Sequence, residues 1–137
     1  MRKYLIATHG TFAGGIKSSI DLILGETENV FLIQAYLEEN KSLQEEIEKV
    51  MKQINPGDEL IVFTDLTGGS ITNQILQFAL KENVFIVTGV NLPLVLDIML
   101  ADPEIPVSEV IETGIGNARE QIVFVNKLIH SSKDIHD

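Results

Sequence analysis

The sequence predicts an α/β fold, in which helices cover both faces of an open, mainly parallel β-sheet. Two patterns support this prediction. Short apolar runs, typical of strands buried on both faces, alternate with longer segments whose apolar residues recur at helical spacing. Strands that alternate with helices form right-handed βαβ units, so successive strands are expected to run parallel. The 137 residues fit a single domain.

The individual elements follow from these patterns in chain order. Strands are expected at residues 3–8, 29–36, 60–64 and 84–89. Helices are expected at residues 11–24, 42–54, 70–80 and 91–100, and from about Ser108 onward. Ser42, with Glu45 three residues later, has the spacing of a capping box at the start of the second helix, and Gly25 is placed to end the first.

The carboxyl-terminal part of the chain allows two interpretations. Residues 121–126, "QIVFVN", have the β-branched and aromatic content of a fifth strand, although the length of the segment favours a helix running through it. Residues from about 127 to 137 form a polar tail, which we expect to be frayed at the end of the single domain.

The chain is acidic and contains no cysteine. Its 10 basic and 20 acidic residues give a formal charge of −10, which would repel nucleic-acid phosphates and anionic lipid surfaces. The absence of cysteine excludes disulfides, thiolate metal sites and thiol catalysis, and it favours an intracellular address. We see neither a signal peptide nor an apolar stretch long enough to span a bilayer. We therefore expect a soluble, cytoplasmic domain that binds no nucleic acid.

The polar residues that carry chemistry are expected at the carboxyl ends of the strands. Ligands of open α/β sheets bind beyond these ends, where the chain reverses its direction across the sheet. His9 follows the first strand, and Asp65 follows the third. In the strand order 2-1-3-4 these two strands are neighbours about 4.8 Å apart, so His9 and Asp65 would face each other.

These residue types suit phosphoryl transfer. A carboxylate beside an imidazole accepts the N–H of one ring nitrogen and leaves the lone pair of the other nitrogen free, so His9 would be an activated nucleophile. Gly68 and Gly69 allow a tight turn before the third helix, and Ser70 can cap that helix and offer its hydroxyl. This loop would cradle an anion such as phosphate. We expect neither a metal ion nor a cofactor.

Each feature alone also has a structural explanation. A histidine after a strand is commonly a solvated loop residue, Asp65 could cap a turn, and Gly-Gly-Ser before a helix is an ordinary turn. The conjunction of all three at neighbouring strand ends favours a functional site. We interpret His130 and His136 as solvated, because their spacing does not suit a helical metal site. Five glutamates after the second strand and on the following helix are interpreted as a solvated surface, which could also dock a basic partner. They are Glu38, Glu39, Glu45, Glu46 and Glu48.

Three stretches resemble those of one known family. "THGTFAGG" follows the first strand, "TDLTGGSITN" the third and "GVNLPLV" the fourth. In this order and at these distances they resemble the enzyme IIA components of the mannose-type sugar phosphotransferase system, and the resemblance extends more weakly to residue 126. Two residues depart from the family pattern. Ile71 stands where many members have a proline after Gly-Gly-Ser, and this should matter little because Ser70 can still cap the helix. Thr67 stands where some members have an aromatic residue before the glycines.

The resemblance implies a role for each site residue. His9 would be the phosphoryl acceptor, Asp65 its orienting partner and Ser70 a hydrogen-bond donor, with Gly68 and Gly69 beside the phosphate. Phosphoryl groups would arrive from the histidine phosphocarrier protein HPr and leave to a IIB component, with the membrane subunits IIC and IID involved only indirectly. The resemblance also implies a homodimer whose subunits exchange residues 121–126 as an antiparallel fifth strand.

Three alternatives share the fold or part of the site. A IIA-like phosphotransfer subunit of a dihydroxyacetone kinase also resembles this chain, but its third-strand loop lacks the full Gly-Gly-Ser pattern. A flavodoxin-like flavin or nucleotide binder would need a glycine fingerprint that "THGTFAGG" does not match. A receiver-type signalling domain would use Asp65 as the phosphoryl acceptor, but it would need further carboxylates after the first strand to hold magnesium.

Overall fold

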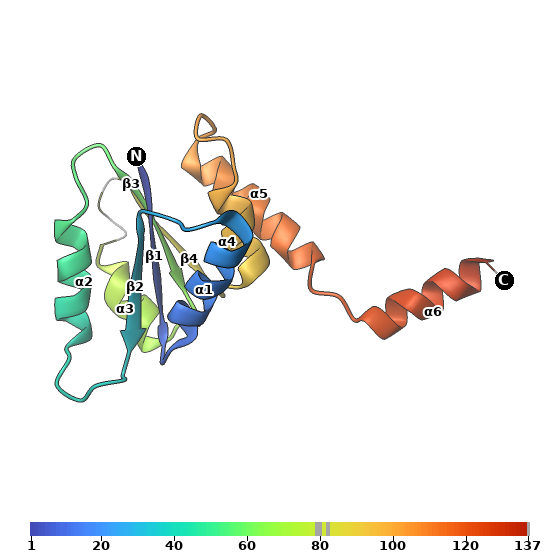
Figure 1. Cartoon of the computed structure of the whole chain (residues 1–137), viewed down its shortest axis with the longest axis horizontal. Helices are drawn as coiled ribbons and strands as arrows, with labels where there is room; N and C mark the ends of the chain where they lie inside the picture. The colour runs from blue at the N-terminus through green and yellow to red at the C-terminus, as the bar shows by residue number, and fades with distance from the viewer. Residues whose placement is uncertain (79–80, 82, 137) are drawn as a thin grey trace.

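In the computed structural model the chain forms a four-stranded parallel sheet with the order β2-β1-β3-β4 (Figure 1). The structure describes residues 1–78, 81 and 83–136, with side chains up to residue 130. The predicted α/β class and strand order are confirmed. The strands are β1 (Arg2–His9), β2 (Val30–Ala35), β3 (Glu59–Thr64) and β4 (Val84–Thr88). The helices are α1 (Phe12–Leu24), α2 (Leu43–Lys52), α3 (Ser70–Leu76), α4 (Leu92–Met99), α5 (Val107–Glu120) and α6 (Val125–His136).

Helices cover both faces of the sheet, as predicted. Alternate residues of β1 point to opposite faces, so Ile6 packs in one apolar cluster and Leu5 in the other. Helices α1, α4 and α5 bury their apolar residues on the face of Ile6, together with Phe63 of β3. Helices α2 and α3 cover the face of Leu5 (Figure 1). The central strands β1 and β3 are therefore buried on both sides, which explains their continuous apolar sequences.

Side-chain caps fix the start of two helices. The Ser42 hydroxyl accepts a hydrogen bond from the Glu45 backbone N–H at 3.4 Å, as the capping pattern predicted. Asn91 Oδ1 accepts from the Leu94 N–H at 2.9 Å at the start of α4. The third helix was expected over residues 70–80. The structure gives α3 as Ser70–Leu76, and residues 79 and 80 lie outside the described ranges.

The carboxyl-terminal part is helical over much of its length in this single chain. Residues 122–124 have no regular secondary structure in this single chain, and α6 begins at Val125 and continues through the polar tail to His136. Val125, Leu128 and Ile129 lie on one side of a helix, a spacing that suits α6. A strand exchanged between subunits needs a second copy, so it stays a prediction. Among the described residues, no helix is both long enough and apolar enough to cross a membrane.

Candidate functional site

The candidate site lies at the carboxyl ends of the two central strands. His9 is the last residue of β1, and Asp65 directly follows the last residue of β3. β1 lies between β2 and β3, and His9 pairs with Ala35 at the end of β2. The chain reverses its direction across the sheet between β1 and β3, so this is the position at which open α/β sheets bind ligands.

His9 and Asp65 are in direct contact, as the sequence predicted. Asp65 Oδ2 lies 2.8 Å from Nδ1 of the His9 ring and also accepts the His9 backbone N–H at 2.8 Å. Burial alone would raise the pKa of Asp65, but the two hydrogen bonds from His9 and the charge of its ring outweigh burial and lower that pKa. Asp65 is therefore a carboxylate at neutral pH and accepts the proton on Nδ1, so the neutral form of the ring has its lone pair on Nε2.

The two side chains differ in exposure. The His9 side chain is 43% exposed, whereas that of Asp65 is 12% exposed. A partner protein can thus reach the ring, while the carboxylate that orients it stays shielded.

Polar side chains fix the loop after His9 onto the start of α1. Buried Thr8 accepts the Ala13 backbone N–H through its hydroxyl at 2.8 Å, and Gln34 Oε1 accepts the Gly14 N–H at 3.2 Å. Gly10 turns the chain with a φ of 58°, and its N–H donates to the Ala35 carbonyl at 3.0 Å. These contacts hold the backbone on both sides of His9.

The loop after β3 is also held in place. Gly68 has a φ of 74°, a left-handed conformation that favours glycine. Thr72 Oγ1 lies 2.7 Å from the Leu66 carbonyl oxygen and 2.8 Å from Thr64 Oγ1, which anchors the loop to the end of β3. The structure thus places Gly68 and Gly69 in the turn that leads from Asp65 into α3. The expectation that Ser70 caps this helix is wrong, because Gly69 occupies the N-cap position, no side chain caps the helix, and Ser70 is its first residue.

Sequence reasoning missed one residue of this site. Tyr36 directly follows β2, and its ring centroid lies 5.4 Å from that of the His9 ring. Its hydroxyl oxygen lies 2.6 Å from Ser70 Oγ. Tyr36 belongs to none of the recognised motifs, but it follows a strand beside β1, so the rule that located His9 and Asp65 could also have located Tyr36.

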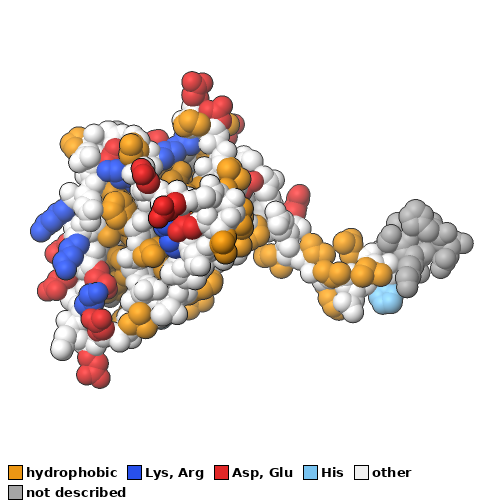
Figure 2. Space-filling model, viewed as in Figure 1, with side chains coloured by type: hydrophobic (Ala, Val, Ile, Leu, Met, Phe, Trp, Pro, Cys, Tyr) orange, Lys and Arg blue, Asp and Glu red, His pale blue; other side chains and the backbone are white. Residues whose placement is uncertain are grey.

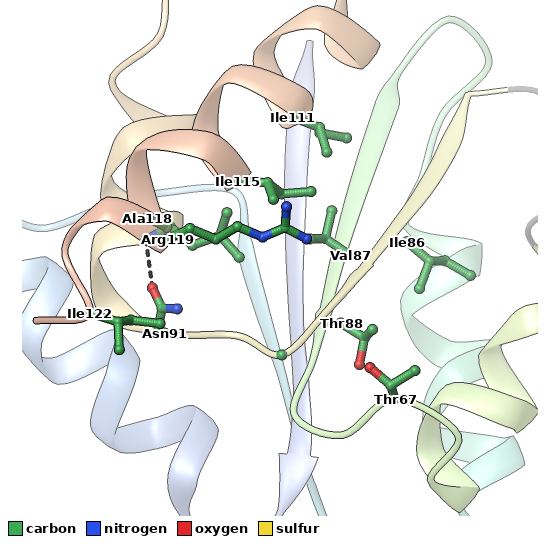
Figure 3. Close-up of a pocket in the computed structure, with 12 residues that line it drawn as sticks. Thr67, Ile86, Val87, Thr88, Asn91, Ile111, Ile115, Ala118, Arg119 and Ile122 are labelled. Carbon is green, nitrogen blue, oxygen red and sulfur yellow. Dashed lines mark hydrogen bonds between the residues drawn. The ribbon is translucent and has the colours of Figure 1, made fainter.

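A groove of about 460 Å³ lies beside the outer edge of β4. Val87 of β4 lies on the same face of the sheet as Ile111 and Ile115 of α5, and the Arg119 side chain extends into the groove between them (Figure 3). Ile86 also lines the groove but points to the opposite face of the sheet. Asn91 lines this groove and caps α4. His130, which was interpreted as solvated, is exposed.

Known proteins share both the sequence pattern and the fold of this chain. A family model described as "PTS system fructose IIA component" matches residues 3–114. The "PTS system fructose-specific EIIA component" of Bacillus subtilis is 30% identical over 101 residues, which cover 72% of this chain and 69% of that protein. The "PTS system mannose-specific EIIAB component" of Escherichia coli is 28% identical over 117 residues, which cover 80% of this chain and 36% of that longer protein.

Solved structures agree with these matches. A phosphoenolpyruvate-dependent sugar phosphotransferase system permease from Klebsiella pneumoniae superposes with a TM-score of 0.89 at 34% identity, covering 93% of each chain. A phosphotransferase system EIIA component from Streptococcus agalactiae gives a TM-score of 0.78 at 26% identity, covering 93% of this chain and 99% of that one. Fold and sequence thus define a component of a phosphotransferase system. The chain belongs to the family of mannose-type IIA components.

Proposed function

We propose that this chain is a phosphohistidine carrier that accepts a phosphoryl group on Nε2 of His9 and passes it to a second protein. The observation that carries the proposal is the contact between Asp65 Oδ2 and His9 Nδ1 at 2.8 Å. In the neutral ring this contact leaves Nε2 with a free lone pair, which a phosphoryl acceptor needs.

The transfer needs little covalent chemistry from the protein. The Nε2 lone pair forms a bond to phosphorus while the bond from phosphorus to the donor nitrogen breaks, and the donor nitrogen keeps that electron pair. Because the proton stays on Nδ1, the ring gains positive charge, which the Asp65 carboxylate offsets. Delivery reverses these steps, with the electron pair returning to Nε2. Positioning and charge stabilisation are the main contributions of the site.

Ser70 and the glycines before it support the phosphoryl oxygens in this proposal. The Ser70 hydroxyl and the Gly68 backbone N–H are donors on the loop that carries Asp65, whereas the Gly69 N–H donates to the Leu66 carbonyl at 3.3 Å within the turn. Backbone dipoles can hold a phosphoryl group without a basic patch, which is compatible with the charge of −10.

The proposed partners are two proteins used in turn. The histidine phosphocarrier protein HPr would donate the phosphoryl group, and a IIB component would accept it for sugar uptake through IIC and IID membrane subunits. The sugar-specific names of the matched relatives, fructose in one and mannose in another, support this role over that of a dihydroxyacetone kinase subunit.

The direct test is intact-mass spectrometry at neutral pH after incubation with phosphoenolpyruvate, enzyme I and HPr. We expect one added phosphoryl group on the wild type and none on His9→Ala. His130→Ala is the matched control, because it removes another exposed histidine, and it should be phosphorylated like the wild type. No gain by the wild type in the presence of charged HPr would refute the proposal.

We also propose that the carrier is a homodimer. β4 lies at the edge of the sheet and leaves backbone groups available for pairing, and the groove beside it is largely apolar. Figure 2 shows apolar side chains gathered on the segment that leaves α5 and on the start of α6. Exposed members of this group are Ile122 (77%), Phe124 (72%) and Leu128 (62%).

Pairing residues 121–126 of one copy along β4 of the other would bury this apolar segment. It would also require residues 125 and 126 to leave the first turn of α6. Sedimentation at micromolar concentration should give twice the chain mass of 15.2 kDa. Phe124→Asp should weaken the dimer, and a wild type that sediments only at 15.2 kDa would exclude it.

A further inference from the structure

Tyr36 connects the two proposed functional side chains. It directly follows Ala35, the residue that pairs with His9 across the β1–β2 ladder. Its ring centroid lies 5.4 Å from that of the His9 ring, with the ring planes inclined at 43°. Its hydroxyl oxygen lies 2.6 Å from Ser70 Oγ. The hydroxyl pair therefore lies next to the imidazole that is proposed to carry the phosphoryl group.

The backbone at Tyr36 is strained. Its φ is 67°, in the left-handed region that residues with bulky side chains rarely adopt. Such strain persists only where neighbouring contacts hold it, and it concentrates at functional sites. Here the hydrogen bond from the Gly10 N–H to the Ala35 carbonyl holds the preceding residue at 3.0 Å. The strained turn directs the Tyr36 side chain toward Ser70, although the tyrosine remains 59% exposed.

The bond between the two hydroxyls leaves one proton for a further acceptor. Each hydroxyl carries one proton and can accept hydrogen bonds. With the Tyr36 O–H as the donor in the contact with Ser70 Oγ, the Ser70 hydroxyl keeps its own proton free. A phosphoryl oxygen bound beside the His9 ring is the kind of acceptor that this proton would serve.

We propose that Tyr36 is a positioning residue, which holds the Ser70 hydroxyl so that the pair presents one O–H donor to the phosphoryl group on His9. This inference rests on the proposed carrier function. It differs from a purely structural role because Tyr36 would act through Ser70, and the effects of removing the two hydroxyls should not add.

The test is a double-mutant cycle on the rate of phosphoryl uptake from charged HPr, measured by rapid quench and intact mass. Tyr36→Phe and Ser70→Ala should each slow uptake by about threefold to tenfold, the effect expected for one hydrogen bond. The double variant should be no slower than Ser70→Ala alone. Tyr4→Phe is the matched control, since it removes a tyrosine hydroxyl near the opposite end of β1, and it should keep the wild-type rate.

The outcomes separate this inference from the proposed function. If the wild type takes no phosphoryl group from charged HPr, the carrier function fails, and the role of Tyr36 fails with it. If the wild type is phosphorylated and Tyr36→Phe matches its rate, only the role of Tyr36 is refuted. If the double variant is slowed by the product of the two single-variant factors, the role of Tyr36 is also refuted, because Tyr36 then acts independently of Ser70.

Discussion

Replacing Asp65 by alanine should slow phosphoryl transfer without removing the acceptor. Asp65 Oδ2 receives two hydrogen bonds of 2.8 Å, one from the His9 ring and one from the His9 backbone. The ring contact strengthens as Nε2 bonds to phosphorus and the imidazole gains positive charge. A hydrogen bond between charged groups contributes about 1.5–3 kcal/mol, so its loss slows transfer by about 10- to 150-fold.

The assay is rapid-quench phosphoryl uptake from charged HPr, with Asp58→Ala as the control. Asp58 has a matching set of partners at the opposite end of β3, because it accepts the Asn55 N–H at 2.9 Å and pairs with Lys3 Nζ at 2.7 Å. Asp58→Ala should therefore lose similar contacts but transfer at the wild-type rate. A wild-type rate in Asp65→Ala, or equal slowing in both variants, would refute the reasoning.

Three further predictions concern stability. Phe63→Ala should lower the free energy of unfolding in urea by about 3–5 kcal/mol, because Phe63 is fully buried; a loss below about 1 kcal/mol would contradict this. Thr8→Val should cost about 1–3 kcal/mol in the same assay, because it leaves the buried Ala13 N–H without its acceptor, whereas unchanged stability would show that the cap is dispensable. Hydrogen bonds from Lys17 and Thr27 lower the pKa of Asp21 to about 2. Asp21 therefore stabilises the fold above the ordinary pKa of an aspartate, and this stabilisation is lost as the pH falls toward about 2. The difference in Tm between the wild type and Asp21→Asn should shrink as the pH is lowered through this range, and a difference that grows would contradict the prediction.

The sequence was sufficient to predict the sheet and the central pair of the site. The strands β1 and β3 are short apolar runs, and parallel pairing brings their carboxyl ends together whatever the details of the loops. His9 and Asp65 are the polar residues at those ends, so their contact followed from the strand order.

Two features depended on information that local sequence patterns do not contain. The contact of Tyr36 with Ser70 joins residues 34 positions apart and depends on a positive φ that an aromatic residue rarely adopts. Residues 121–126 have β-branched and aromatic side chains that suit a strand, but a strand needs a neighbouring edge with which to pair. Within one chain Val125 instead begins α6, and Phe124 remains exposed.

The most direct test of the account is to locate the phosphoryl group on the histidine ring. The chain has three histidines, so the spectrum of His9→Ala identifies the signals of His9 in ¹⁵N-histidine-labelled protein. Long-range ¹H–¹⁵N correlation of the phosphorylated wild type should show phosphorus on Nε2 of His9 and a proton on Nδ1, the nitrogen that contacts Asp65. Phosphorus on Nδ1, or a base-labile acyl phosphate on Asp65 in place of phosphohistidine, would contradict the account.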